Sequence, residues 1–293
     1  MTDVTATIPI LPERGVQNSE TPELDKLAVK PQERYKFIRS IGFGGMKGVL
    51  LVYDRDTERE LAMAIIPDFR DRPKRDLERF VHEAKVTAKL EHPNIVSVHD
   101  IGIDQSGSPY FTMQYLHGMT LDNLLRRLIA QDPQVEKYTL ARLLLIYLRV
   151  CNAVDFAHSR GICHLDLNPA NIYIGDFGEV QVIDWGLARD TDPSGREIGP
   201  REENNRGTPG FIPPEMFDPK HRRPLDIRAD VFALGALLYS MLALKTPLAG
   251  LPVDDILRLT LQGRIPLPSK VAPEGRIVPE SLEAVAMKAL SPD

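Results

Sequence analysis

The sequence predicts an α+β protein in which a small β-rich part precedes a larger, mainly helical part. Two patterns predict it. Short segments rich in alternating and β-branched residues gather before residue 117, and helical periodicity prevails from residue 120 onward. The 293 residues, 43% of them hydrophobic, suffice for one two-lobed domain or for two small ones. No internal repeat interrupts this order.

The first half of the chain begins with residues 1–33, where four prolines stand among polar and acidic residues. That composition predicts a flexible tail. The elements expected after the tail are a hairpin of residues 41–53 and 61–66 around the polar turn 54–60, a helix at 76–90, and a strand at 109–116 that leads into a linker. The second half has helical patterns at about 120–131, 139–160, 228–243 and 279–290.

The bulk properties exclude several classes of protein. A formal net charge of −5 argues against a dominant nucleic-acid surface. The two cysteines, Cys151 and Cys163, both lie in apolar surroundings without disulfide or zinc spacing, which favours a reducing, cytoplasmic compartment. No signal peptide and no apolar run long enough to span a bilayer is seen in the sequence.

The stretch from His164 to Gly186 carries the chemistry. Asp166, Asn171 and Asp184 are polar residues on an otherwise apolar stretch. The residues between Asn171 and Asp184 have a pattern typical of a β-hairpin. Asn171 and Asp184 offer the hard oxygen ligands that Mg²⁺ prefers. The carboxylate of Asp166 can accept a proton from a substrate hydroxyl.

This stretch resembles the catalytic loop and the metal-binding Asp-aromatic-Gly turn of protein kinases. The resemblance, to bacterial serine/threonine kinases, covers nearly everything after residue 34. Further segments that carry it are the glycine-rich G-F-G-G-M at 42–46, Glu83 in a helical pattern, Met113–Leu116, the G-T-P-G-F-I-P-P-E at 207–215, and Asp230. It implies a two-lobed protein kinase fold: a tail at 1–33, an N-lobe at 34–113, a hinge at 114–116, and a C-lobe at 117–293 that stops before the family's last helix.

The resemblance also implies the cofactors and partners: ATP with Mg²⁺ or Mn²⁺, a protein substrate with a serine or threonine hydroxyl, and no nucleic acid. It implies a cytoplasmic protein, or the cytoplasmic part of a larger protein with a membrane or sensor region beyond residue 293. The implied catalytic residues are Asp166, Lys47, Glu83 and Asn168, and the implied metal ligands are Asn171 and Asp184. The implied nucleotide-binding residues are Ile41, Gly42, Gly44, Val49, Ala62, Met113, Gln114, Leu116 and Tyr173.

The catalytic lysine departs from the family pattern. The family carries this lysine on its third strand, where the register here gives Ala64, and Lys47 replaces the third glycine of the phosphate loop. If the hairpin centres near residue 56 or 57, Val49 lies opposite Ala64, and Lys47 is a diagonal neighbour of position 64 at roughly 7–8 Å. With-no-lysine kinases show the same pairing, which implies that Lys47 takes over the catalytic role. The alternative is that Lys47 is an exposed loop lysine and Glu83 a solvated surface charge.

Three more departures bear on activity. Leu165 replaces an arginine that would pair with an activating phosphate, so regulation without such phosphorylation is expected. Asn168 replaces a lysine that contacts the transferred phosphate, which removes transition-state stabilisation of about 10²-fold or more in rate. Tyr173 replaces an aliphatic floor under adenine, where it can stack or crowd the pocket. These changes keep open a second hypothesis, a pseudokinase that acts as a nucleotide-binding or scaffold module.

Overall fold

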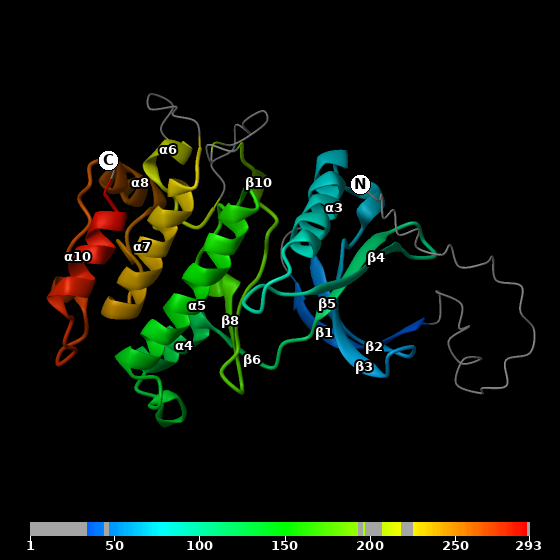
Figure 1. The fold of residues 1–293 in the computed structure, drawn as a ribbon, viewed down its shortest axis with the longest axis horizontal. Coiled ribbons are helices and arrows are strands. Elements are labelled where there is room, and N and C mark those ends of the chain that lie inside the picture. Colours follow the sequence, from blue (N-terminus) through cyan, green and yellow to red (C-terminus); the bar gives the residue numbers. More distant parts are fainter. Residues whose placement is uncertain (1–33, 44–46, 193–195, 197–206, 218–224, 292–293) are drawn as a thin grey trace, which may run out of the picture.

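The computed structural model describes residues 34–43, 47–192, 196, 207–217 and 225–291. The predicted tail and Gly44 lie outside these residues. A twisted sheet with one long helix forms one half of the described chain, and a bundle of helices forms the other, as Figure 1 shows. The β-rich part followed by the helical part is the arrangement that the sequence predicts.

The N-terminal half is built on a five-stranded antiparallel sheet. Its strands are β1 (Tyr35–Phe43), β2 (Gly48–Asp54), β3 (Arg59–Ile65), β4 (Val98–Ile103) and β5 (Pro109–Gln114), in the order β1-β2-β3-β5-β4. The segment 41–53, expected as one arm of a hairpin, is divided between two strands, because Phe43 ends β1 and pairs with Gly48 at the start of β2. The β2–β3 hairpin has the expected register, with Val49 opposite Ala64.

A cluster of charged side chains, here called the turn cluster, fixes the β2–β3 turn. It consists of Arg34, Asp54 and Asp100. The Asp54 carboxylate is fully buried. It accepts hydrogen bonds from Arg34 Nε and Nη2 at 2.9 and 2.8 Å, from Thr57 Oγ1 at 2.8 Å and from the Asp56 backbone at 3.0 Å. Burial opposes ionisation, but these donors outweigh it and lower the pKa of Asp54 to about 2.

Helix α3 (Lys74–Lys89) covers one face of the sheet. Its Phe80 and Ala84 pack against Ala64 and Phe111 of β3 and β5, and Phe80 and Phe111 have ring centroids 5.0 Å apart. The opposite face carries a smaller apolar cluster around Leu61. Because side chains alternate along a strand, Ala62 and Ala64 share the face that α3 covers.

The C-terminal half is mainly helical. Its longer helices are α4 (Leu121–Ile129), α5 (Leu140–Ser159), α7 (Arg228–Ala243), α8 (Val253–Leu261) and α10 (Glu280–Ala289). Its shorter elements are β6 (Gly118–Thr120), η2 (Pro133–Val135), β7 (Ile162–Cys163), η3 (Pro169–Asn171), β8 (Ile172–Gly175), β9 (Val180–Val182), β10 (Arg189–Asp190), α6 (Pro214–Phe217) and α9 (Pro268–Val271). In the N-terminal half, the short helix η1 (Phe69–Asp71) precedes α3. The large core of the C-terminal half centres on α5 and α7, which stand side by side in Figure 1.

The predicted helices are found within two residues of their expected ends, but β4 and α8 were not predicted. In β4 the half-buried positions include Asp100 and Gly102, so no apolar alternation marks the strand. In α8 only Ile256 and Thr260 are buried, too few positions for a helical period to stand out. Among the described residues, no helix is long and apolar enough to cross a membrane.

Candidate active site

Lys47 lies directly before β2 and reaches into the space between the two halves. Its Nζ contacts Glu83 Oε1 at 2.5 Å and Asp184 Oδ1 at 2.9 Å. We call these three residues the lysine cluster. The Lys47 side chain is 25% exposed and that of Glu83 is 10% exposed. Of the two alternatives left open by the sequence, the geometry therefore matches a lysine and a glutamate that face each other, not two solvated side chains.

Charge and burial compete within the lysine cluster. Burial alone would lower the pKa of Lys47, but the carboxylates of Glu83 and Asp184 outweigh it and raise that pKa, so the amine is protonated at neutral pH. Burial raises the pKa of Glu83 against the opposing attraction of Lys47. Burial also works against ionisation of Asp184, but the ammonium prevails and lowers the pKa of this carboxyl.

Space for the lysine cluster depends on Gly186. A Cβ atom at this position would lie 3.2 Å from Glu83 Oε2 and 3.3 Å from Asp184 Oδ1. These separations are tighter than ordinary van der Waals contact. The absence of a side chain at residue 186 thus lets α3 and the segment after β9 approach each other.

The loop before β8 carries Asp166, Asn168 and Asn171. Asp166 Oδ1 accepts hydrogen bonds from Asn168 Nδ2 and from Thr208 Oγ1, each at 3.2 Å, and Asn171 Nδ2 lies 3.2 Å from Asp166 Oδ2. Asn168 also caps η3, since its Oδ1 accepts from the Ala170 backbone at 2.9 Å. Burial raises the pKa of Asp166, and the nearby Asp184 adds to this effect. The carboxylate is thus held by neutral donors where the family pattern would add a cation.

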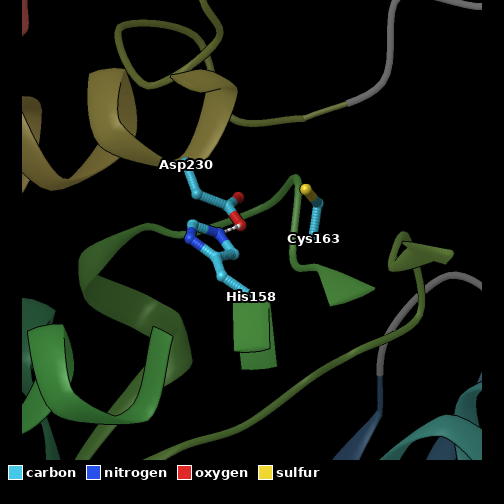
Figure 2. A group of neighbouring side chains, drawn as sticks. All are labelled: His158, Cys163 and Asp230. Carbon is cyan, nitrogen blue, oxygen red and sulfur yellow. Dashed lines mark hydrogen bonds and ion pairs between the residues drawn. The ribbon is translucent and has the colours of Figure 1, made fainter. Parts of the chain in front are cut away.

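Asp230, from the first turn of α7, holds this loop in place. Its Oδ2 and Oδ1 accept hydrogen bonds from the backbone N–H groups of His164 and Leu165, both at 2.8 Å. His158 Nε2 lies 2.8 Å from Asp230 Oδ2, and Cys163 stands beside the pair, as Figure 2 shows. Leu165 has a left-handed backbone with φ of 64°, which these bonds help to maintain. His158, Cys163 and Asp230 are close enough to hold a metal ion, but Asp230 already accepts three hydrogen bonds, so we regard the group as a brace.

The predicted metal ligands, Asn171 and Asp184, lie on two segments that a backbone hydrogen bond holds together. The Ile183 N–H donates to the Asn171 carbonyl oxygen at 2.9 Å. Because Asn171 uses its Nδ2 toward Asp166, its amide oxygen remains as an acceptor, and the lowered pKa of Asp184 keeps that carboxylate ionised. Two hard oxygen donors, one of them charged, fit a Mg²⁺ or Mn²⁺ ion.

The predicted nucleotide-binding residues lie along neighbouring strands. Val49 of β2 pairs with Gly42 on one side and with Ala64 on the other, and Ala62 of β3 pairs with Met113 of β5. Ile41 is half-buried on β1. Gln114 ends β5, and Leu116 follows it. The remaining residue of the set, Gly44, is not among those described.

Tyr173, on β8, reaches the hinge. Its hydroxyl donates to the Leu116 carbonyl oxygen at 3.0 Å. The side chain is partly buried and links the helical half to the connection between the halves. This bond was not expected from the sequence, because it depends on how the hinge passes over β8.

Two further contacts were missed by sequence reasoning. The contact between Lys47 and Asp184 could not be predicted from a local sequence pattern, because 137 residues separate the two. His82 Nε2 lies 3.1 Å from the Ala188 carbonyl oxygen and so joins α3 to the segment after the Asp-Trp-Gly turn. In the sequence, the neighbouring Glu83 was the one indication that this part of α3 contacts the site.

Residues 35–285 match the model of the protein kinase domain. The chain is 36% identical over 279 residues to the serine/threonine-protein kinase PknD of Chlamydia caviae, an alignment that covers 89% of this chain and 29% of that protein. It is 33% identical to PknD of Protochlamydia amoebophila, covering 88% of this chain and 28% of the relative. The chain thus spans less than a third of the length of these curated relatives.

Proposed function

This chain belongs to the protein kinase family. We propose that it transfers the γ-phosphoryl group of ATP to serine or threonine hydroxyl groups of a protein. Lys47 takes the role of the family's third-strand lysine, because Ala64 occupies that position. The observation that carries the proposal is the Lys47 ammonium between Glu83 and Asp184, at 2.5 and 2.9 Å. An ammonium held by two carboxylates keeps a fixed position and a full charge. That is what a contact to phosphate oxygens needs.

Asp166 is the group that accepts the proton of the attacking hydroxyl. Its raised pKa moves its basicity toward neutral pH, where general bases work best. Thr208 and Asn171, which hydrogen-bond to its two carboxylate oxygens, fix its orientation. The protein serine or threonine side chain would therefore meet an oriented base.

Asn171 and Asp184 would hold Mg²⁺, which when bound neutralises charge on the phosphates. The backbone of Gly42 and Gly44 would approach the phosphates of ATP. Its base and sugar would be held by Ile41, Val49, Ala62, Met113 and the hinge residues Gln114 and Leu116. Tyr173 would lie under the base, with its hydroxyl already engaged by Leu116. We place the chain in the cytoplasm, alone or as the cytoplasmic part of a larger membrane protein, since it spans less than a third of the length of its relatives.

A second candidate function is a pseudokinase that binds nucleotide or partners without phosphotransfer. Asn168 favours it, because a neutral amide stands on the Asp166 carboxylate where the family has a lysine. The intact set of Asp166, Asn171 and Asp184 favours the enzyme instead, since a scaffold has no chemical need for all three.

One pair of measurements separates the two functions. Transfer of labelled phosphate from ATP to a generic basic protein should be detectable for the wild type and lost in Asp166→Asn. Nucleotide binding is followed separately through Trp185, the single tryptophan of the chain, which is buried with its ring 4.5 Å from that of His164. Because it adjoins Asp184, its fluorescence should change when ATP is added with Mg²⁺, and Asp184→Asn should abolish the change.

Binding without transfer would make the chain a pseudokinase. Absence of both signals in the folded protein would contradict the kinase and the nucleotide-binding pseudokinase, and would leave the scaffold that binds partners alone. Binding of ATP that is equally strong with and without divalent metal would contradict the assigned roles of Asn171 and Asp184.

A further inference from the structure

A hollow of about 490 Å³ lies beside the hinge, between Gln114–His117 and the β8–β9 turn at Gly175–Glu179. We call it the hinge hollow. It contains Gln114, Leu116 and Tyr173 but none of the predicted nucleotide-binding residues on β1, β2 and β3. It adjoins the cleft in which the nucleotide is proposed to bind and shares these three residues with it, but it extends toward the β8–β9 turn instead of toward β1, β2 and β3.

The walls of the hinge hollow are fixed by bonds between the hinge and β8. The Asp176 backbone donates to the His117 carbonyl oxygen at 3.0 Å, in addition to the bond between Tyr173 and Leu116. Gly118, with φ of 144°, brings its backbone so close to β8 that an added Cβ would lie 2.1 Å from the Ile174 carbonyl oxygen. The hollow is thus preformed.

Aromatic rings and carboxylates line the hinge hollow together. The rings are those of Tyr115, His117, Tyr173 and Phe177, and the carboxylates are those of Asp176 and Glu179. Tyr115 and His117 have ring centroids 4.5 Å apart in an edge-to-face arrangement, and Phe177 is 95% exposed. Within the described part of the chain, neither carboxylate forms a salt bridge.

Two guanidinium groups at the rim of the hollow donate to neutral oxygens. Arg39 Nη2 donates to the Tyr115 hydroxyl at 3.0 Å, and Arg149 donates to the Gly178 carbonyl oxygen. The charges of Asp176 and Glu179 thus have no cation partner among the described residues, although Glu179 Oε2 accepts a hydrogen bond from the Phe177 backbone at 3.2 Å. Aromatic faces next to uncompensated carboxylates favour a cation.

The side chain of Gln181, which also lines the hinge hollow, has a buried acceptor without a donor. Gln181, on β9, is 8% exposed, and its Nε2 donates to Gln114 Oε1 at 3.0 Å. Its own Oε1 is buried and accepts no hydrogen bond from any residue that the structure describes. A buried acceptor without a donor is destabilising, so a ligand that brings an N–H group would gain by pairing with it once the Gln181 amide turns toward the hollow.

We propose that the hinge hollow binds an arginine side chain from an extended segment of a partner protein. A guanidinium group meets all three features at once: it is planar and stacks on aromatic rings, it carries a charge that the two carboxylates attract, and it has donors for Gln181. Lysine has the charge but lacks the planar face. This binding requires neither ATP nor phosphotransfer, so it stands apart from the proposed function.

The proposal is tested with three fluorescein-labelled dodecapeptides of glycine, serine and leucine that contain one arginine, one lysine or one citrulline at the same place. Fluorescence anisotropy is measured on the folded chain without nucleotide. We expect the arginine peptide to bind most tightly and citrulline, which keeps the shape and loses the charge, at least about tenfold more weakly. Asp176→Asn with Glu179→Gln should weaken the arginine peptide by a similar factor, and Phe177→Ala should weaken it severalfold.

The control removes the same charge elsewhere, through Glu274→Gln with Glu280→Gln on the exposed surface near α10. This variant should bind the arginine peptide as the wild type does. Equal weakening by both double variants would reduce the effect to general attraction by an acidic protein and overturn the proposal. Equal binding of arginine and lysine peptides, or no saturable binding by the folded wild type, would overturn it as well. Gln181→Leu, compared with the wild type at matched folding, should also lose affinity for the arginine peptide.

Discussion

The turn cluster and the lysine cluster lie at opposite ends of β2, and in each a single cation is held by carboxylates: Arg34 by Asp54, Asp100 and the adjacent Asp56, and Lys47 by Glu83 and Asp184. In the turn cluster, Asp54 accepts four hydrogen bonds and its pKa is low. In the lysine cluster, Glu83 is nearly as buried, yet the only donor to its carboxylate among the described residues is Lys47. Its pKa is raised instead of lowered.

Under the proposed function, this difference separates a cluster that stabilises the fold from one that contacts the nucleotide. A carboxylate saturated with donors stabilises the fold and has nothing further to bind. Carboxylates that share one ammonium keep acceptor capacity for an added cation, and the ammonium keeps donors for an anion. We therefore expect substitutions in the lysine cluster to change activity and those in the turn cluster to change stability.

The largest effect is expected from Lys47→Ala. Loss of a preorganised charge contact should lower phosphotransfer by roughly 10²–10³-fold. The thermal unfolding midpoint should change little, because the side chain is partly exposed and lies at a strand end. Lys85→Ala, which removes an exposed lysine two residues from Glu83 on α3, serves as the control. Equal activity of Lys47→Ala and the wild type would leave Lys47 without a catalytic role.

Asp54→Asn should act on stability. Lowering the pKa of Asp54 from its ordinary 3.8 to about 2 corresponds to about 2 kcal/mol of stability above pH 4. Because the folded-state pKa is depressed, this contribution is present at neutral pH and disappears as pH falls from about 4 toward 2. Urea unfolding at pH 7 and pH 3 measures it, and Glu60→Gln is the control on the neighbouring strand. A difference from the wild type that does not shrink at low pH would contradict this account.

Moving the lysine back to β3 sharpens the comparison. Lys47→Gly combined with Ala64→Lys should be about tenfold more active than Lys47→Gly alone, since the ammonium would return to Glu83 from the adjacent strand. Recovery should be partial, because Ala64 is fully buried among Phe80, Ala84 and Phe111. Ala64→Lys alone should help little, since two ammonium groups would compete for Glu83 and repel each other. The assay is phosphate transfer by all four proteins at matched folding, and a double variant no better than Lys47→Gly would count against the shared site.

The smallest effect is expected from Thr57→Ala, next to the turn cluster. It removes one of four donors to Asp54 and should cost about 1 kcal/mol or less in unfolding free energy. Activity per folded molecule should stay unchanged. A loss as large as that of Asp54→Asn would mean that the four bonds act as a unit.

Much of the fold and the residues of the candidate site could be predicted from the sequence. The hairpin register, with Val49 opposite Ala64, follows from a short turn between two strand-like segments. Asp166, Asn171 and Asp184 stand close together in the sequence and share one spacing pattern. By contrast, the contact of Lys47 with Asp184 and that of Arg34 with Asp100 join segments that only tertiary packing brings together. The hinge hollow was not predicted for the same reason, since its walls come from two segments about 60 residues apart.

The environment of Lys47 also determines its reactivity toward electrophiles. Only a neutral amine is nucleophilic, and the carboxylates of Glu83 and Asp184 raise the pKa of Lys47. Acylating reagents at neutral pH should therefore modify exposed lysines such as Lys85 first and Lys47 last. Glu83→Gln should speed the labelling of Lys47, so covalent probes aimed at the cleft would report how tightly its ammonium is held.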